Sequence, residues 1–317
     1  MRYFLCLSYD GSAFCGWQIQ PSAPSVQQCL ESALYRLLGR PVPVTGAGRT
    51  DTAVNAYHYV AHFDWDGILP FEASDFNYKL NAILPHGVAV HSVSPVADDL
   101  HARFSAKRRE YTYFIHRQKD PFVRAYSWQC GYPGLDFDAM NKACQFLLGT
   151  HDFSCFEKTG TDNKTSICTV YEAFWAPYTP SHIQVMESEG GTMFPGACPP
   201  PDQYRGRGPQ IFGYFRRELA SGENVQKAVG GAGVKRSVTE SPGDIVPPSD
   251  YPYWYFRIAA DRFLRNMVRA TVGTLIEVGR GKHDPEWVAE LIRSGTRGDA
   301  GESVPGNALF LNKVEYP

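Results

Sequence analysis

The chain has 317 residues, of which 43% are apolar, and its formal net charge is −2 at pH 7. This length and composition allow a large buried core and predict a globular protein with two lobes or one large α/β unit. The net charge argues against a protein that coats nucleic acid indiscriminately, because such proteins are strongly basic, but basic residues can still gather locally.

Signals for a membrane or an oxidising compartment are lacking in the sequence. It has no run of 18 apolar residues, and residues 1–4 lead directly into a strand pattern rather than into the apolar block of a signal peptide. Its eight cysteines are scattered without a CxxC pair, which predicts reduced thiols rather than a zinc site or a disulfide framework. We therefore expect a cytoplasmic protein with no membrane partner.

In the first half of the chain, alternating apolar residues predict strands at 3–9, 54–64, 88–93 and 110–117. Helical spacing of apolar residues begins after Ser25, which forms a capping-box pattern with Gln28, and Gly39 is the expected end of this helix. A shorter helix is expected at 75–84, ended by Pro85.

The second half repeats this alternation. A helix is expected from Asp136 to Gly149, strands at 167–178, 182–187 and 253–260, a helix with an apolar side from 263 to 276, and a last helix bounded by Asp284, Pro285 and Gly295. Two rounds of strands and helices predict an α/β (α+β) protein with two related lobes, 1–105 and 106–317. Residues 190–250 are rich in Gly, Pro and Ser and show little periodicity, so we expect an insertion there, outside the catalytic core.

Asp51 follows the glycine-rich turn GAGRT and precedes an alternating aromatic run. The glycines allow a sharp turn and close approach of a ligand, but a turn cap or a surface Arg–Asp pair would explain this aspartate equally well. His58 and His62 are four residues apart in a strand pattern, about 13 Å in an extended chain, so we expect no metal site here.

The first basic cluster lies in the segment HARFSAKRREYTYFIHR. It places Arg103, Lys107, Arg108 and Arg109 before a strand in which Tyr111 and Tyr113 share a face. Cations for phosphates beside rings for bases are typical of nucleic-acid binding, although a solvated basic turn before a core strand is an equally good interpretation.

The second basic cluster lies in the segment DRFLRNMVRATVGTLIEVG. On the predicted helix, Arg262, Arg265 and Arg269 recur at i, i+3 and i+7, opposite the apolar side. This spacing fits either a solvated helix face or the wall of a basic cleft.

Six blocks of the sequence, in this order and spacing, resemble the TruA family of tRNA pseudouridine synthases. The blocks are SYDGSAFCGWQIQP, SVQQCLESAL, GAGRTD, HARFSAKRREYTYFI, HDFSCF and FLRNMVRATVGTLIEVG. The resemblance covers nearly the whole chain except residues 190–250. It implies the pseudouridine synthase fold, with two related lobes of mixed, largely antiparallel sheets flanked by helices around a basic central cleft.

The resemblance also implies a reaction and a partner. The expected reaction is isomerisation of uridine to pseudouridine in the anticodon stem-loop of tRNA, without a metal or an organic cofactor, by a protein that forms a homodimer. The glycosidic bond breaks, the uracil turns, and it is reattached through carbon 5.

The same resemblance implies roles for individual residues. Asp51 matches the catalytic aspartate, as nucleophile or base, and Arg269 matches the arginine that pairs with it. Tyr111 matches the tyrosine that packs on the target base and assists proton removal from carbon 5, and Arg49 matches the arginine that helps to extrude the nucleotide. Further residues are expected to bind the tRNA: Asn55, Arg103, Lys107, Arg108, Arg262 and Arg265.

Two departures from the family pattern follow Asp51. Ala53 stands where the family has glycine, and Asn55 where it has histidine; Ala308 is a milder change near the C-terminus. A relative that binds RNA without turnover is therefore the main alternative, and a hydrolase that uses Asp51 and His58 is a more distant one.

Overall fold

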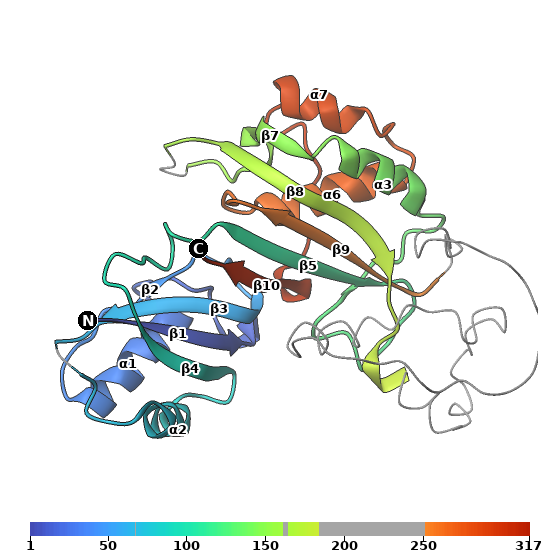
Figure 1. Cartoon of the computed structure of the whole chain (residues 1–317). Coiled ribbons are helices and arrows are strands. Elements are labelled where there is room, and N and C mark those ends of the chain that lie inside the picture. Colours follow the sequence, from blue (N-terminus) through green and yellow to red (C-terminus); the bar gives the residue numbers. More distant parts are fainter. Residues whose placement is uncertain (67, 161–163, 184–250) are drawn as a thin grey trace, which may run out of the picture. The chain divides into compact units, whose positions relative to one another are not determined.

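The computed structural model describes residues 1–66, 68–160, 164–183 and 251–317 (Figure 1). The chain divides into two compact units, Met1–Ala176 with Trp254–Pro317, and Pro177–Tyr253. All the predicted site residues belong to the first unit, which is described below. In the described ranges, no helix is both long and apolar enough to cross a membrane.

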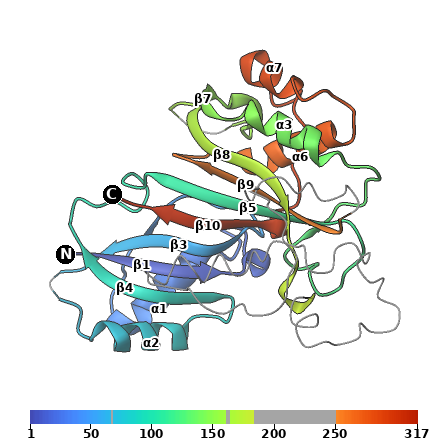
Figure 2. The ribbon, with the colours of Figure 1, turned by 45° about the vertical axis from the view of Figure 1, so that its right-hand side comes forward.

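The described residues form one mixed sheet of ten strands in the order β4-β1-β3-β10-β5-β9-β8-β7, with β2 beside β3 and β6 beside β5 (Figures 1 and 2). The strands are β1 Arg2–Tyr9, β2 Thr45–Gly46, β3 Asn55–Asp64, β4 Val88–Val96, β5 Arg108–His116, β6 Trp128–Gln129, β7 Gly149–Asp152, β8 Ile167–Pro177, β9 Tyr253–Ala260 and β10 Leu309–Glu315. β1 is antiparallel to β3 and β4, and β10 is antiparallel to β5 but parallel to β3. This mixed, mostly antiparallel sheet with helices confirms the predicted fold class.

Two helices pack on the part of the sheet that contains β1, β3 and β4 (Figure 2). They are α1, Val26–Leu38, and α2, Ala73–Ile83. The Ser25 hydroxyl accepts the backbone N–H of Gln28 at 3.3 Å, and Gly39 ends α1 in the left-handed conformation with φ 75°. The two predicted ends of this helix are therefore confirmed. Alternate residues of β1 are buried, as the predicted strand requires.

The other part of the sheet carries α3, Phe137–Gln145, and α6, Met267–Gly279, with α7, Trp287–Ser294, beside β7. In α3, the Phe137 ring stacks on Trp254 of β9, with 3.6 Å between the ring centroids. Nearly every residue of α6 is buried, whereas Arg269 and Glu277 are half-buried.

Three predicted helix boundaries are wrong. α6 begins at Met267 rather than at Phe263, because Asn266 has φ 66°, which is left-handed and cannot continue a right-handed helix. α3 ends at Gln145, and Gly149, with φ 99°, begins β7. α7 begins at Trp287, after a turn at the predicted N-cap, and ends before Gly295 as expected.

Two predictions concern residues that the structure describes in part or not at all. The insertion at 190–250 lies outside the described residues, and so does most of the strand expected at 182–187; residues 181–183 are helical instead. The division into lobes at 105 and 106 stays a prediction.

Candidate active site

Asp51 lies in the turn that joins β2 to β3. The two strands pair antiparallel, Thr45 with His62 and Gly46 with Ala61, and the N–H of Ala47 donates to the Val60 carbonyl at 2.8 Å. The turn therefore starts and ends on the sheet, so its tip is held at one place relative to the core.

The segment after β1 is hydrogen-bonded to this turn. Backbone hydrogen bonds join Trp17 N to the Thr50 carbonyl at 3.3 Å and Ala53 N to the Phe14 carbonyl at 3.2 Å. Gly16 has φ 91°, and a Cβ there would collide with the Thr50 carbonyl oxygen. Glycine at this position is required both by the backbone conformation and by the close approach of the two segments.

Asn55 holds the end of the turn. Its side-chain oxygen accepts the N–H of Gly11 at 2.8 Å, and its side-chain nitrogen donates to the Asn307 carbonyl at 2.7 Å. The side chain is buried, and its amide joins the segments of Gly11 and Asn307 to its own. Both polar atoms of the side chain are thus bonded within the protein. This geometry indicates a structural role for Asn55 and does not support the predicted contact with tRNA.

Two arginines face the Asp51 carboxylate. Nη1 of Arg269 lies 3.3 Å from Oδ2, and Nε of Arg265 lies 3.9 Å from Oδ1. Nε of Arg269 also donates to the Val304 carbonyl at 2.7 Å, which fixes the guanidinium plane beside Asp51. The Asp51 side chain remains 23% exposed, so the carboxylate is paired yet open to a ligand.

Arg265 is not on the helix that carries Arg269. Because α6 begins at Met267, both Arg262 and Arg265 lie in the turn before it, and the predicted single helix face with three arginines is wrong. Tertiary contacts nevertheless bring Arg265 and Arg269 to the same carboxylate. Arg262 is half-buried, and its backbone N–H donates to the Asp261 carboxylate at 2.7 Å.

Tyr111 lies on β5 and is 9% exposed. Its ring meets Phe263 edge to face, with 5.0 Å between centroids. Burial raises the pKa of Tyr111 to about 12, while the nearby charge of Arg109 lowers this pKa and that of Asp51 raises it. The phenol is therefore neutral near pH 7.

The other predicted tRNA contacts differ in how available they are. Arg49 is exposed and its Nε donates to Gln18 at 2.9 Å, and Arg103 and Lys107 are exposed as well. Arg108 instead pairs with Glu172 at 2.7 Å, so part of its charge is already neutralised within the protein.

Sequence comparisons identify the family of the chain. The sequence model of the tRNA pseudouridine synthase family matches residues 143–317. The tRNA pseudouridine synthase A proteins of Parabacteroides distasonis and Bacteroides thetaiotaomicron are each 39% identical to this chain, covering all of it and 96% and 91% of their own lengths. The corresponding protein of Porphyromonas gingivalis is 36% identical, over 100% of this chain and 97% of its own.

The chain belongs to the tRNA pseudouridine synthase family. The resemblance inferred from the six blocks is thereby confirmed, and so is the class of enzyme, an isomerase.

One residue of the site is missed by the sequence reasoning about this synthase. Arg109 donates to four carbonyl groups: those of Ala47 at 3.0 Å, Arg103 at 2.6 Å, Asp261 at 2.6 Å and Ala106 at 3.5 Å. It thus ties the Asp51 turn to both basic clusters, and burial lowers its pKa. In the sequence it is one of three consecutive cations, and nothing there distinguishes it from its neighbours.

Proposed function

We propose that this protein isomerises uridine to pseudouridine in the anticodon stem-loop of tRNA, with Asp51 as the catalytic carboxylate and without a cofactor. The observation that carries the proposal is the partly exposed Asp51 carboxylate between Arg265 and Arg269, next to the buried Tyr111, in a chain of this family. The homodimer implied by the resemblance and the cytoplasmic location expected from the sequence belong to the same proposal.

The reaction requires a group that attacks the nucleotide or accepts a proton while the glycosidic bond breaks. An anionic carboxylate can do either. Arg269 supplies the positive counter-charge, and its second hydrogen bond to Val304 holds that charge in place when bound RNA excludes water. The N1–carbon 1′ bond breaks, the uracil turns, and carbon 5 bonds to carbon 1′ of the ribose. Carbon 5 then loses one proton and N1 gains one, so the atoms balance without an external reactant.

Tyr111 and Arg49 have different roles in this proposal. Because the pKa of Tyr111 is about 12, its phenolate is scarce at neutral pH, and we assign to the ring the packing role on the target base. Arg49 lies two residues before Asp51 and is exposed, which suits a side chain that holds the nucleotide after it leaves the stack.

Replacement of Asp51 by asparagine tests the proposal. Asp51→Asn keeps the shape but removes the anion, so we expect pseudouridine formation to fall to less than about one hundredth of the wild-type rate, with tRNA affinity within about twofold. The measurements are position-resolved pseudouridine mapping on an unmodified tRNA transcript and a binding titration.

Asp66→Asn is the matched control, because Asp66 is also paired with an arginine, Arg40 at 3.1 Å, but lies on the surface. Turnover above about one tenth of wild type in Asp51→Asn would remove Asp51 from the mechanism. A wild-type protein that binds tRNA and forms no pseudouridine would establish the RNA-binding alternative instead.

A further inference from the structure

Phe104 is 77% exposed, and it lies between the exposed cations Arg103 and Lys107. A single exposed apolar residue is common on protein surfaces and by itself means little. At this position, however, hydrogen bonds fix the backbone around the ring. The conformation of the turn 101–105 therefore holds the Phe104 side chain at the surface.

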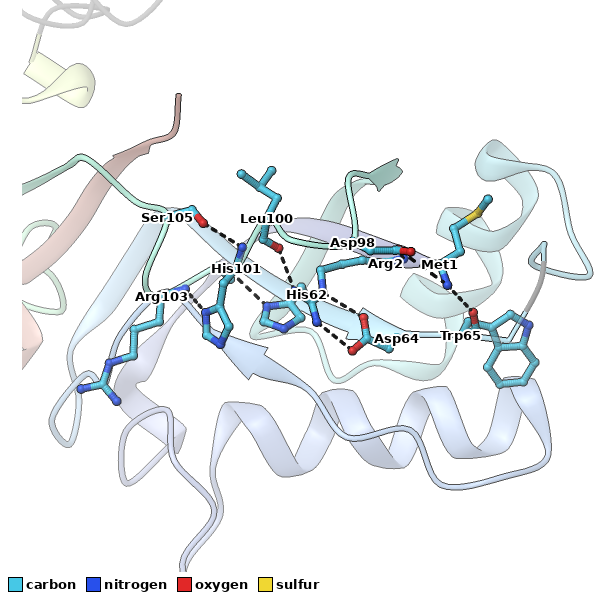
Figure 3. Close-up of polar contacts among 11 residues, drawn as sticks. Met1, Arg2, His62, Asp64, Trp65, Asp98, Leu100, His101, Arg103 and Ser105 are labelled. Carbon is cyan, nitrogen blue, oxygen red and sulfur yellow. Dashed lines mark hydrogen bonds and ion pairs between the residues drawn. The ribbon is translucent and has the colours of Figure 1, made fainter.

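The turn is closed within itself (Figure 3). The N–H of Ser105 donates to the His101 carbonyl, and the Ser105 hydroxyl accepts the N–H of His101, both at 2.9 Å. Nδ1 of His101 accepts the N–H groups of Arg103 at 3.0 Å and of Phe104 at 3.3 Å. The His101 and Phe104 rings lie 4.5 Å apart, so one side of the phenyl ring has a neighbour and the rest remains exposed.

The middle of the turn is anchored in the core by Ala102, which is buried. Its N–H donates to Nδ1 of His62 at 3.1 Å, and its carbonyl accepts the hydroxyl of Tyr316 at 2.7 Å. His62 comes from β3, so the turn has a fixed position relative to the strand that follows Asp51.

Arg109 connects this turn to the active site. Through the Arg103 and Ala47 carbonyls it joins the turn to the loop that carries Asp51. The turn that carries Phe104 therefore has a fixed position relative to the loop that carries Asp51.

The charges near the ring favour RNA. Arg103 lies over the edge of the Phe104 ring, with 5.6 Å from its guanidinium carbon to the ring centroid, and Lys107 adds a second exposed cation. Two of the acidic groups nearby are already engaged, since Asp64 pairs with the Arg2 guanidinium and Asp98 accepts the Arg2 N–H (Figure 3). An aromatic face beside cations is the arrangement that binds unpaired bases and their phosphates.

We propose that Phe104 is a stacking platform for an unpaired base of the tRNA, with Arg103 and Lys107 on the adjoining phosphates. This inference rests on the proposed function in that it takes tRNA as the bound molecule. It adds a substrate contact outside the catalytic group, and it concerns affinity rather than chemistry.

The experiment measures binding of an unmodified tRNA transcript and turnover at saturating transcript. For Phe104→Ala we expect about a tenfold rise in Kd with kcat within about twofold of wild type. Phe104→Trp should bind as tightly as wild type, whereas Phe104→Leu, apolar but not aromatic, should resemble Phe104→Ala. Tyr78→Ala is the control, because Tyr78 on α2 is 76% exposed and should leave binding unchanged.

Wild-type affinity in Phe104→Ala, or full affinity in Phe104→Leu, would overturn the stacking proposal while leaving the proposed reaction intact. A variant that loses affinity together with its wild-type oligomeric state would show a subunit contact instead, and would also overturn it. If the wild-type protein forms no pseudouridine but Phe104→Ala still weakens binding, the proposed reaction fails and the platform stands.

Discussion

Ala53 adopts a backbone conformation that is unfavourable for alanine. Its φ is 63°, in the left-handed region, where a Cβ costs about 1–2 kcal/mol. The surrounding contacts impose this conformation, because the N–H of Ala53 donates to the Phe14 carbonyl and the next residues enter β3. The glycine of the family pattern at this position thus has a physical explanation, and the departure to alanine costs stability.

Ala53→Gly should accordingly stabilise the protein. We expect a gain of about 1 kcal/mol in the free energy of unfolding, less than the full steric cost because glycine makes the unfolded chain more flexible. The gain is measured from urea denaturation midpoints. Ala125→Gly, at an exposed position without positive φ, should instead lose a few tenths of a kcal/mol. Lower stability in Ala53→Gly would contradict the strain argument.

Arg269 makes two contacts that one lysine cannot reproduce. In Arg269→Lys the single ammonium cannot reach both the Val304 carbonyl and Asp51, so we expect kcat to fall roughly 10- to 100-fold with the protein still folded. Single-turnover rates measure the loss of activity, and circular dichroism shows whether the variant is folded. Arg265→Lys, at a half-exposed and longer contact, should cost only a few-fold. A wild-type rate in Arg269→Lys would mean that charge alone suffices.

At the scale of elements, the contact between β3 and the turn 101–105 depends on a neutral histidine. Burial, together with the smaller effects of the charges of Arg2 and His101, lowers the pKa of His62 to about 4, and the charge of Asp64 opposes this shift. Because the folded-state pKa lies below the ordinary value of 6.5, the unfolded chain binds the additional proton first. The stabilisation is therefore complete above about pH 6.5 and is lost as the pH falls toward 4.

His62→Asn should flatten this pH dependence. The asparagine oxygen can replace Nδ1 as acceptor for the Ala102 N–H and does not titrate. In the wild type, His62 should contribute a loss of up to about 3 kcal/mol between pH 6.5 and 4, and this part should be missing in the variant. Urea denaturation at each pH measures the two slopes. Equal slopes would assign the acid sensitivity to other groups.

At the scale of the whole molecule, every predicted site residue lies in the unit formed by Met1–Ala176 and Trp254–Pro317. β8 and β9 are neighbours in the sheet, and the N–H of Tyr178 donates to the Tyr253 carbonyl at 3.1 Å, so the chain leaves and returns at nearby points. A short connection between these strands is therefore compatible with the sheet.

Replacing residues 190–250 with a short Gly-Ser linker should preserve folding and Asp51-dependent turnover at saturating tRNA, since loop-closure entropy changes slowly with length. Weaker tRNA binding is expected, because the replacement removes seven basic residues: Arg205, Arg207, Arg216, Arg217, Lys227, Lys235 and Arg236. Thermal unfolding and saturation kinetics measure both outcomes. A replacement variant that does not fold, or that binds tRNA normally without turnover, would place the segment in the catalytic core.

The elements of the first unit could largely be predicted from the sequence, because burial repeats with the local period of a strand or helix. Ser25 and Gly39 marked the ends of α1 for the same local reason, since a cap depends on residues within one turn. Where an end depended on distant contacts, the prediction was wrong. The clearest case is α6, where asparagine rather than glycine takes up the left-handed conformation that delays the start of the helix.

The family, the class of reaction and the turn that carries Asp51 could be inferred from short ordered motifs in the sequence. Which groups contact Asp51 and its turn could be seen only in the tertiary structure. Asp51 and Arg269 are 218 residues apart in the sequence. The Asn55 side chain bonds to the backbone of two other segments, and the carbonyl partners of Arg109 lie in three different segments. The physical reason is that local patterns record periodic burial and backbone preference, whereas a contact between distant residues depends on strand order and register across the whole sheet.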